Sequence, residues 1–271
     1  MRTLSPEMLA YLWLLVEHKM NILITGGTGS GKTTLLNAIA FFIPEEARVV
    51  SIEDTRELNL PRENWLPSVV RTATGAKESE EIDLFALLKS SFRQNPDYVI
   101  VGEVRGKEAY VLFQGMASGH PSISTIHADS VDTVIKRLET PPIELSPTLL
   151  NVLDCVCIMT HAVTKKQETR KLKEIVEVIN VSPEGIALIN TPFVWNPGDD
   201  QFYFKRNSKI FERIMKRYGI RREGLEFEFS RRVQLIFRLQ QLGIFEFKQV
   251  QDVINEYYKK PEAVLKKFGI Q

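Results

Sequence analysis

Cysteine, net charge and long hydrophobic runs are all scarce in this sequence. Only Cys155 and Cys157 occur among 271 residues, which excludes a disulfide-stapled fold and fits a reducing, cytoplasmic compartment. The apolar stretch Met8–Val16 is too short to span a bilayer, and charged residues follow it where a signal peptide would have small ones. We therefore expect a soluble globular protein.

Opposite charges nearly cancel, with 35 Lys and Arg against 34 Asp and Glu, but they are unevenly distributed. Residues 1–200 contain 19 basic and 26 acidic side chains, whereas residues 201–271 contain 16 basic and 8 acidic ones. A basic C-terminal part suggests contact with an acidic partner, a neighbouring subunit or an anionic membrane surface, although a solvated helix face would have the same composition. The acidic remainder argues against nucleic acid as a partner.

Short apolar runs alternate with helical patterns over most of the chain, which predicts a parallel sheet covered by helices on both faces. Ser5, Pro6 and Glu7 are signals of a helix N-terminus, so the first helix is expected at Pro6–His18. The next elements are expected as strands at Asn21–Thr25, Arg48–Glu53, Asp97–Val101, Ser122–His127 and Cys155–Thr160, and as helices at Lys32–Phe42, Leu84–Phe92, Lys107–Met116 and Val131–Leu138.

The pattern changes after this α/β part. Apolar and polar residues alternate around two turns rich in Pro and Gly, which predicts an antiparallel β-meander with strands at Glu174–Val181, Ile186–Ile189, Phe193–Trp195 and Gln201–Phe204. From Ser208 the pattern is helical to the end. We therefore divide the chain into a core at residues 1–172, a meander attached to it at 173–206 and a helical segment at 207–271.

Residues Gly26–Thr33 match the phosphate-loop pattern GxxxxGK[ST], between an apolar strand and a helix as that loop requires. The glycines allow backbone N–H groups to surround phosphate at a helix N-terminus. Lys32 would bind the β- and γ-phosphates, and the Thr33 hydroxyl would bind Mg²⁺. The sequence thus predicts a nucleotide site whose contacts are Gly26, Gly27, Thr28, Gly29, Ser30, Gly31, Lys32, Thr33 and Thr34.

An acidic cluster follows the second expected strand. Glu53, Asp54 and Glu57 repel one another, which costs free energy unless a cation or a polarised water is held there. Near a γ-phosphate, one of these carboxylates can orient the attacking water. A solvated acidic turn is the alternative.

The strand that ends at Glu103 resembles a Walker B strand, which normally contributes an Mg²⁺-binding acid. Gly102 replaces the Asp of most phosphate-loop enzymes, so Glu103 would act alone or through water. Arg105 is expected either to contact phosphate or to pair with a nearby acid.

Two of the four histidines, His120 and His127, lie at the two ends of the strand expected at Ser122–His127. No carboxylate or cysteine at metal-ligand spacing accompanies them, which argues against zinc. A structural histidine is the ordinary interpretation, and contact with the γ-phosphate region is the functional one.

These motifs, in this order, resemble those of the secretion ATPases of type II and type IV secretion, type IV pili and the archaeal flagellum. The resemblance covers Leu4 to about Ile270 and identifies Walker A at Gly26–Thr33, the Asp box at Ile52–Glu57, an atypical Walker B at Pro96–Glu103 and the His box at Gly119–Ala128. The Gly-Glu ending of Walker B is typical of this family. The amino-acid sequences of Ser51–Leu58 and Val101–Gly106 look most like those of archaeal or conjugation-type members.

The resemblance implies roles for five residues. It implies that Glu57 is the general base, that Glu103 is the Walker B carboxylate of the metal site, and that His127 is the His-box residue nearest the nucleotide. Arg71 and Arg93 are similar to family arginines that reach phosphates within or across subunits. The implied fold is a RecA-like α/β core with a β-meander and a C-terminal helical segment, and the implied ligands are ATP and Mg²⁺.

Two features differ from the family pattern. Bacterial type II members have a four-cysteine metal-binding insertion, whereas this chain has only Cys155 and Cys157, which we expect to be small core residues without zinc. Family members also have a large N-terminal domain, but here the phosphate loop begins after 25 residues. We expect a shortened chain, or a cap on another polypeptide, and with it weak ATP hydrolysis and poor hexamer formation.

The resemblance implies an ATP-hydrolysing motor for type II or type IV secretion, or for assembly of pili or archaella. Full-length subunits would form a homo-hexamer and dock on a polytopic platform protein at the cytoplasmic face of the cell membrane. Three alternatives stay open: a DNA translocase or conjugation ATPase of the same fold, a phosphate-loop kinase, and a nucleotide-dependent switch without significant turnover.

Overall fold

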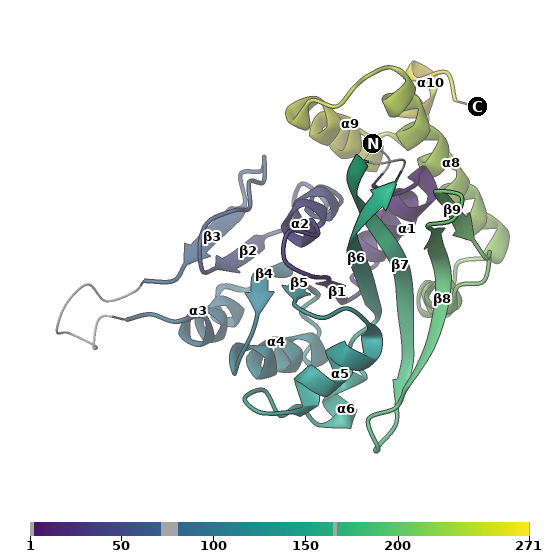
Figure 1. Ribbon diagram of the computed structural model, residues 1–271. Coiled ribbons are helices and arrows are strands. Elements are labelled where there is room, and N and C mark those ends of the chain that lie inside the picture. Colours follow the sequence, from purple (N-terminus) through teal and green to yellow (C-terminus); the bar gives the residue numbers. More distant parts are fainter. Residues whose placement is uncertain (1–2, 72–80, 165–166, 271) are drawn as a thin grey trace.

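The computed structural model describes residues 3–71, 81–164 and 167–270, in which one mixed sheet has helices on both faces (Figure 1). The sheet has nine strands in the order β3-β2-β4-β5-β1-β6-β7-β8-β9. The strands are β1 (Ile22–Thr25), β2 (Val49–Glu53), β3 (Trp65–Val69), β4 (Tyr98–Val104), β5 (Ser122–Ile126), β6 (Cys155–Thr164), β7 (Gln167–Val181), β8 (Ala187–Asn196) and β9 (Gln201–Phe204). The helices are α1 (Pro6–Glu17), α2 (Lys32–Ala40), α3 (Leu84–Ser91), α4 (Glu108–Ala117), α5 (Val131–Glu139), α6 (Pro147–Leu150), α7 (Lys209–Tyr218), α8 (Arg222–Gln241), α9 (Phe247–Lys259) and α10 (Pro261–Lys267).

The first half of the sheet is parallel, as the sequence predicts. β1 lies between β5 and β6, with Ile22 opposite both Ile123 and Cys155. β4 joins β5 to β2 in the same direction. β1, β2 and β5 are buried throughout, which explains their continuous apolar runs. The carboxyl ends of β1, β2, β4 and β5 therefore meet at one edge of the sheet.

One strand of this half, β3, has no counterpart among the expected ones. Its sequence WLPSV contains Pro67, which cannot donate a hydrogen bond to a neighbouring strand and is therefore rare in sheet interiors. β3 is the edge strand and pairs only with β2 in the described sheet. An edge position accommodates the proline.

The second half of the sheet is antiparallel and continues the central sheet through the β6–β7 pair (Figure 1). The boundary expected after residue 172 lies inside β7. The two strands expected at Ile186–Ile189 and Phe193–Trp195 form one strand, β8. Two of its residues, Thr191 and Pro192, face a single residue of β7, and this bulge accommodates the proline.

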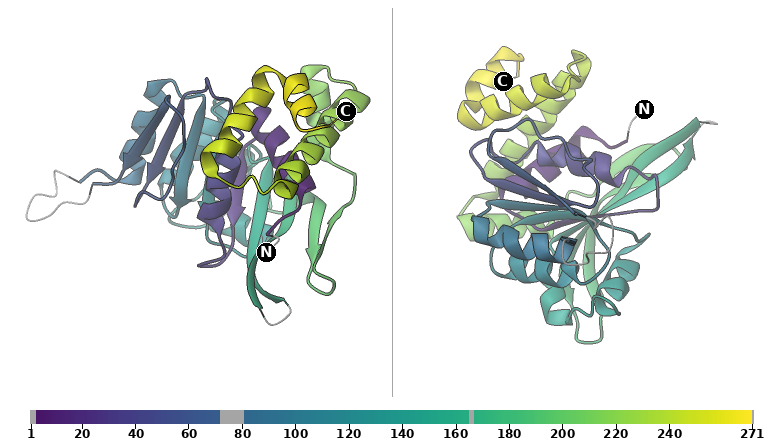
Figure 2. Two further views of the ribbon diagram at one scale, coloured as in Figure 1. Left: turned by 90° about the horizontal axis from the view of Figure 1, so that it is seen from above. Right: turned by 90° about the vertical axis from the view of Figure 1, so that its left-hand side faces the viewer.

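Apolar clusters cover the two faces of the sheet with different helices. One cluster contains residues of α1, α2 and α7 to α10, and the other contains residues of α3 to α6. Figure 2 shows this division in its right-hand view, where the blue and teal helices lie on one side and the purple and yellow ones on the other. Cys155 and Cys157 are buried thiols in β6, which confirms them as core residues.

The N-terminal helix α1 is buried as predicted. Ser5 caps it by accepting a hydrogen bond from the Met8 N–H at 3.3 Å, and eight of its twelve residues are buried. No helix in the described part of the chain combines the length and the apolar character needed to cross a bilayer.

A buried arginine joins the basic C-terminal segment to α1. The guanidinium of Arg232 in α8 is 2.5 Å from Glu17 and 3.0 Å from Glu228, and it lies 4.6 Å from the centre of the Trp13 ring. Only 3% of the Arg232 side chain is exposed, so the guanidinium depends on these carboxylates. Part of the positive charge of the segment is thus neutralised inside the chain.

We predict that Arg232→Ala lowers the free energy of unfolding by about 3 kcal/mol, because it leaves the buried Oε2 of the half-buried Glu17 without its cationic partner. Urea unfolding followed by circular dichroism measures the change. Arg222→Ala is the matched control, since its guanidinium is 62% exposed and 3.7 Å from Glu226. The control should change the free energy by less than about 0.5 kcal/mol. Equal effects of the two substitutions would contradict the prediction.

Candidate functional site

The loop between β1 and α2 depends on glycine at three positions. Gly26, Gly29 and Gly31 have φ angles of +152°, +73° and +95°, which residues with a Cβ rarely adopt. A Cβ at Gly26 would also lie 2.5 Å from the Met159 carbonyl oxygen in β6. The fold therefore explains each of these glycines in the phosphate-loop pattern.

The side chain of Lys32 folds back so that its ammonium group contacts this loop. Its Nζ donates hydrogen bonds to the carbonyl oxygens of Gly26 and Gly27, at 2.9 and 3.1 Å. Burial lowers the pKa of Lys32, and the nearby Glu103 carboxylate opposes that shift. α2 begins at Lys32 without a side-chain cap, so its N-terminal amides suit an anion. Lysine, loop and helix end thus form an arrangement suited to an anion, bordered by Thr33 and Thr34 in the first turn of α2.

Glu53 of the Asp box is a buried structural carboxylate. Only 2% of the residue is exposed, and its Oε1 accepts hydrogen bonds from the backbone N–H groups of Glu57 and Leu58, both at 2.9 Å. A Cβ at Gly102 would lie 3.2 Å from the Glu53 Cγ, close enough that the Glu53 side chain would have to shift slightly. Glu53 therefore fixes the turn that presents Glu57.

Asn37 ties the same turn to α2. Its Nδ2 donates to the Glu57 carbonyl at 3.3 Å, and its Oδ1 accepts from the Asn59 N–H at 3.1 Å. The Glu57 side chain is exposed, while its backbone is held from both directions. The Glu57 carboxylate is thus accessible to water on a turn that is held in place.

Glu103 of Walker B connects the Asp box and the His box. Its Oε2 accepts a hydrogen bond from Arg105 Nε at 2.8 Å, and its Oε1 lies 2.8 Å from His127 Nε2. Arg105 is also 3.8 Å from Asp54 of the Asp box. The hydrogen bond with Glu103 raises the pKa of Arg105. Arg105 is therefore an ion-pair partner of the acids here, and the Asp box, Walker B and His box meet at one place.

The residues at this edge fit Mg²⁺ with phosphate and water ligands. Glu53 Oε2 is a buried acceptor to which no group of the described residues donates a hydrogen bond, and Glu103 Oε1 is a buried oxygen beside His127 Nε2. Among residues 3–71, 81–164 and 167–270, no three His, Cys, Asp or Glu side chains are close enough to hold an ion by themselves. Mg²⁺ commonly binds one or two protein oxygens and completes its shell with water and substrate phosphate.

Comparison with known proteins agrees with this geometry. A model of the type II/IV secretion system protein family matches residues 2–189. The chain belongs to this family. The predicted resemblance to secretion ATPases is thereby confirmed.

Three relatives illustrate the range of similarity within the family. An uncharacterized protein of Methanocaldococcus jannaschii is 42% identical over 238 residues, which are 88% of each chain. The conjugal transfer protein TrbB of Rhizobium radiobacter is 36% identical over 168 residues, covering 60% of this chain and 50% of that protein. The solved VirB11 ATPase of the Brucella suis type IV secretion system, in complex with sulphate, is 30% identical with a TM-score of 0.54, covering 62% of this chain and 51% of that one. The chain thus spans about half the length of the last two, and their likeness confirms the RecA-like α/β fold.

Of the two family arginines, the fold brings only Arg71 to the carboxyl edge. Arg71 follows edge strand β3, and the preceding Val70 N–H donates to the Glu53 carbonyl at 3.1 Å. Arg93 lies in a short 3₁₀ helix that precedes β4, at the amino edge of the sheet. His120 also lies at that edge, with its ring against Phe92. These two residues do not join the phosphate loop of their own chain.

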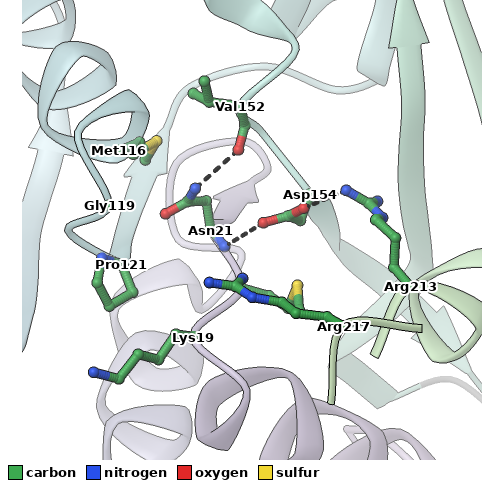
Figure 3. A pocket seen from close by; sticks show the side chains of 10 residues that line it. Lys19, Asn21, Met116, Gly119, Pro121, Val152, Asp154, Arg213 and Arg217 are labelled. Atoms are coloured by element: carbon green, nitrogen blue, oxygen red, sulfur yellow. Dashed lines mark hydrogen bonds and ion pairs between the residues drawn. The ribbon is translucent and has the colours of Figure 1, made fainter. Parts of the chain in front are cut away.

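A cavity of about 300 Å³ lies at the amino edge of the sheet (Figure 3). This edge is opposite the one that holds the phosphate loop. It lies beside an ion pair between Asp154 and Arg213, 2.6 Å apart, and the Asn21 N–H donates to Asp154 at 2.8 Å. Burial raises the pKa of Asp154. The pair fastens α7 to the sheet, which is a structural role.

Two contacts of the site were not expected from the sequence. Asn37 looks like an ordinary helix residue, and only the folded Asp box shows what it binds. Arg170 of β7 packs against Gly31, although the two are far apart in the chain. The glycine at position 102, where most phosphate-loop enzymes have Asp, was the one feature of the sequence that could have pointed to the buried Glu53.

We predict that Glu53→Ala and Glu57→Ala affect stability very differently. Glu53→Ala should lower the free energy of unfolding by about 2 kcal/mol, because two backbone N–H groups lose their acceptor. Glu57→Ala, at an exposed side chain of the same box, should change it by less than about 0.5 kcal/mol. Urea unfolding of both variants tests the assignment, and a larger loss at Glu57 would overturn it.

Proposed function

We propose that this chain binds Mg²⁺ and ATP at the phosphate loop and hydrolyses ATP to ADP and phosphate. The observation that carries the proposal is the convergence of Lys32, the Asp box, Glu103 and His127 at one edge of the sheet. Membership in a secretion ATPase family supports it.

Each side chain would act on the part of the nucleotide, metal or water nearest to it. Lys32 would exchange its two loop carbonyls for the β- and γ-phosphates, and the Thr33 hydroxyl would hold the metal together with Glu103, directly or through water. Bound Mg²⁺ would supply positive charge against the phosphate oxygens. Glu57 would orient the attacking water and accept its proton.

His127 and Arg71 would respond to the γ-phosphate. His127 contacts Glu103, so it would be sensitive to any movement of that carboxylate. Arg71 is exposed at the edge strand, from which it would reach the nucleotide of a neighbouring subunit. Arg93, at the opposite edge, would act only across a subunit boundary.

At the level of the cell, we propose a motor subunit. Hexameric rings would drive type II or type IV-type secretion, or assembly of pili or archaella, from the cytoplasmic face of the membrane. A polytopic platform protein would be the membrane partner, and the basic C-terminal segment would suit such a docking role. In this proposal, residues 1–172 would hold the nucleotide, residues 173–206 would extend the sheet and residues 207–271 would contact the partner.

A conjugation ATPase is the second candidate, because a relative named as a conjugal transfer protein is 36% identical over 168 residues. Such a motor could act on DNA. A switch protein without significant turnover would share the binding residues but would not need both Glu57 and Glu103.

We predict that Glu103→Gln abolishes turnover and leaves nucleotide binding intact. Removal of this carboxylate should lower the rate of phosphate release at least about 100-fold, while ADP affinity changes less than about twofold. Glu226→Gln, at an exposed acid of α8, is the control. Unchanged phosphate release in the Glu103 variant would sink the catalytic assignment.

We also predict that DNA does not stimulate ATP hydrolysis. Residues 1–200 have an excess of acidic side chains, which offers DNA no basic channel. The test compares phosphate release with and without single-stranded DNA at low salt. Stimulation that disappears at high salt would favour the conjugation candidate.

A further inference from the structure

Strand β7 brings an arginine against the phosphate loop. A Cβ placed on Gly31 would lie 3.3 Å from the Cδ of Arg170 and 3.9 Å from its Cβ. Gly31 is the residue that immediately precedes α2, at the end of the helix that would face phosphate. The aliphatic part of Arg170 therefore borders the place where the proposed nucleotide would lie.

The charge of Arg170 has no evident use in holding the fold together. The residue is exposed, and within the described ranges no carboxylate pairs with it. Across the β6–β7 pair it faces His161, while the nearby Glu168 is 3.7 Å from that histidine. A guanidinium carries five N–H donors in a planar fork that matches phosphate oxygens.

The order of the strands determines which end of a nucleotide this arginine would face. Glu103 lies near the carboxyl end of β4 and His127 follows β5, both on one side of β1, whereas Arg170 belongs to β7 on the other side. If the carboxylates handle the γ-phosphate, the α-phosphate and the nucleoside extend toward β6 and β7. Met159 of β6 supports this orientation, because its Cε lies 3.4 Å from the same Gly31 Cβ position and provides an apolar wall.

We propose that Arg170 binds the α-phosphate end of the nucleotide and so contributes equally to the affinity for ATP and ADP. This inference rests on the proposed function, since it assumes a nucleotide on the phosphate loop. It adds a ligand contact from a strand outside the four family motifs.

The test is equilibrium binding of ADP and of a non-hydrolysable ATP analogue, each with Mg²⁺, to the full chain. Arg170→Ala should weaken both affinities about tenfold, as expected for the loss of charge-assisted hydrogen bonds. Arg170→Lys keeps the charge without the fork and should bind both a few-fold more weakly than the unmodified chain. Arg222→Ala, at an exposed arginine of α8, should bind both normally.

The outcomes separate this inference from the proposed function. Normal affinity of both Arg170 variants would overturn the inference alone. A loss confined to the ATP analogue would also overturn it, because it would place Arg170 at the γ-phosphate. Failure of the unmodified chain to bind either nucleotide would overturn the proposed function and the inference together. Equal melting temperatures of Arg170→Ala and Arg222→Ala would show that the binding data refer to folded protein.

Discussion

Parallel pairing of β1 with β5 on one side and β6 on the other is the constraint on which the site depends. It brings the carboxyl ends of β1, β2, β4 and β5 to one edge, and these strand ends and the loops after them contain the phosphate loop, the Asp box, Glu103 and His127. A one-residue slip in a strand would exchange its faces and remove its contribution to the site. The buried apolar runs of β1, β2 and β5 hold the register, so the core and the site are specified together.

Charges at this edge are balanced within the chain. Arg105 pairs with Glu103 and lies near Asp54, and Lys32 satisfies its donors on loop carbonyls. A nucleotide brings further negative charge, which would draw Lys32 from carbonyl dipoles to phosphate. Glu53 Oε2, a buried acceptor for which the described residues provide no hydrogen-bond donor, leaves room in the same network for a cation or its water.

Local sequence predicted the parts whose chemistry is local. The phosphate loop was recognisable because its glycines, lysine and threonine must be consecutive, and the parallel sheet because buried strands read as apolar runs. Edge strand β3 was missed because Pro67 is a poor strand residue that an edge tolerates. The position of Arg170 depends on pairing between strands distant in sequence, and the burial of Glu53 depends on the place of β2 between β3 and β4; spacing along the chain reveals neither.

The uneven charge of the chain has a partly internal explanation. Arg232 is buried against Glu17 and Glu228, and Arg213 pairs with Asp154, so these two cations of the C-terminal segment fasten it to the acidic core. Lys259 pairs with Glu45 of the core as well, and further cations of the segment pair with its own acids: Lys209, Arg222, Arg231 and Lys267. The near-neutral total charge is therefore the sum of an acidic core and a basic C-terminal segment that are joined by ion pairs.

A crystal structure of the chain with Mg²⁺ and ADP would test the central claim most directly. We expect the β-phosphate on the backbone N–H groups of residues 26–33, with Lys32 Nζ on phosphate oxygen and no longer on the carbonyls of Gly26 and Gly27. ADP bound elsewhere, for example beside Arg213 and Arg217 in the cavity at the amino edge, with the Lys32 contacts unchanged, would contradict it.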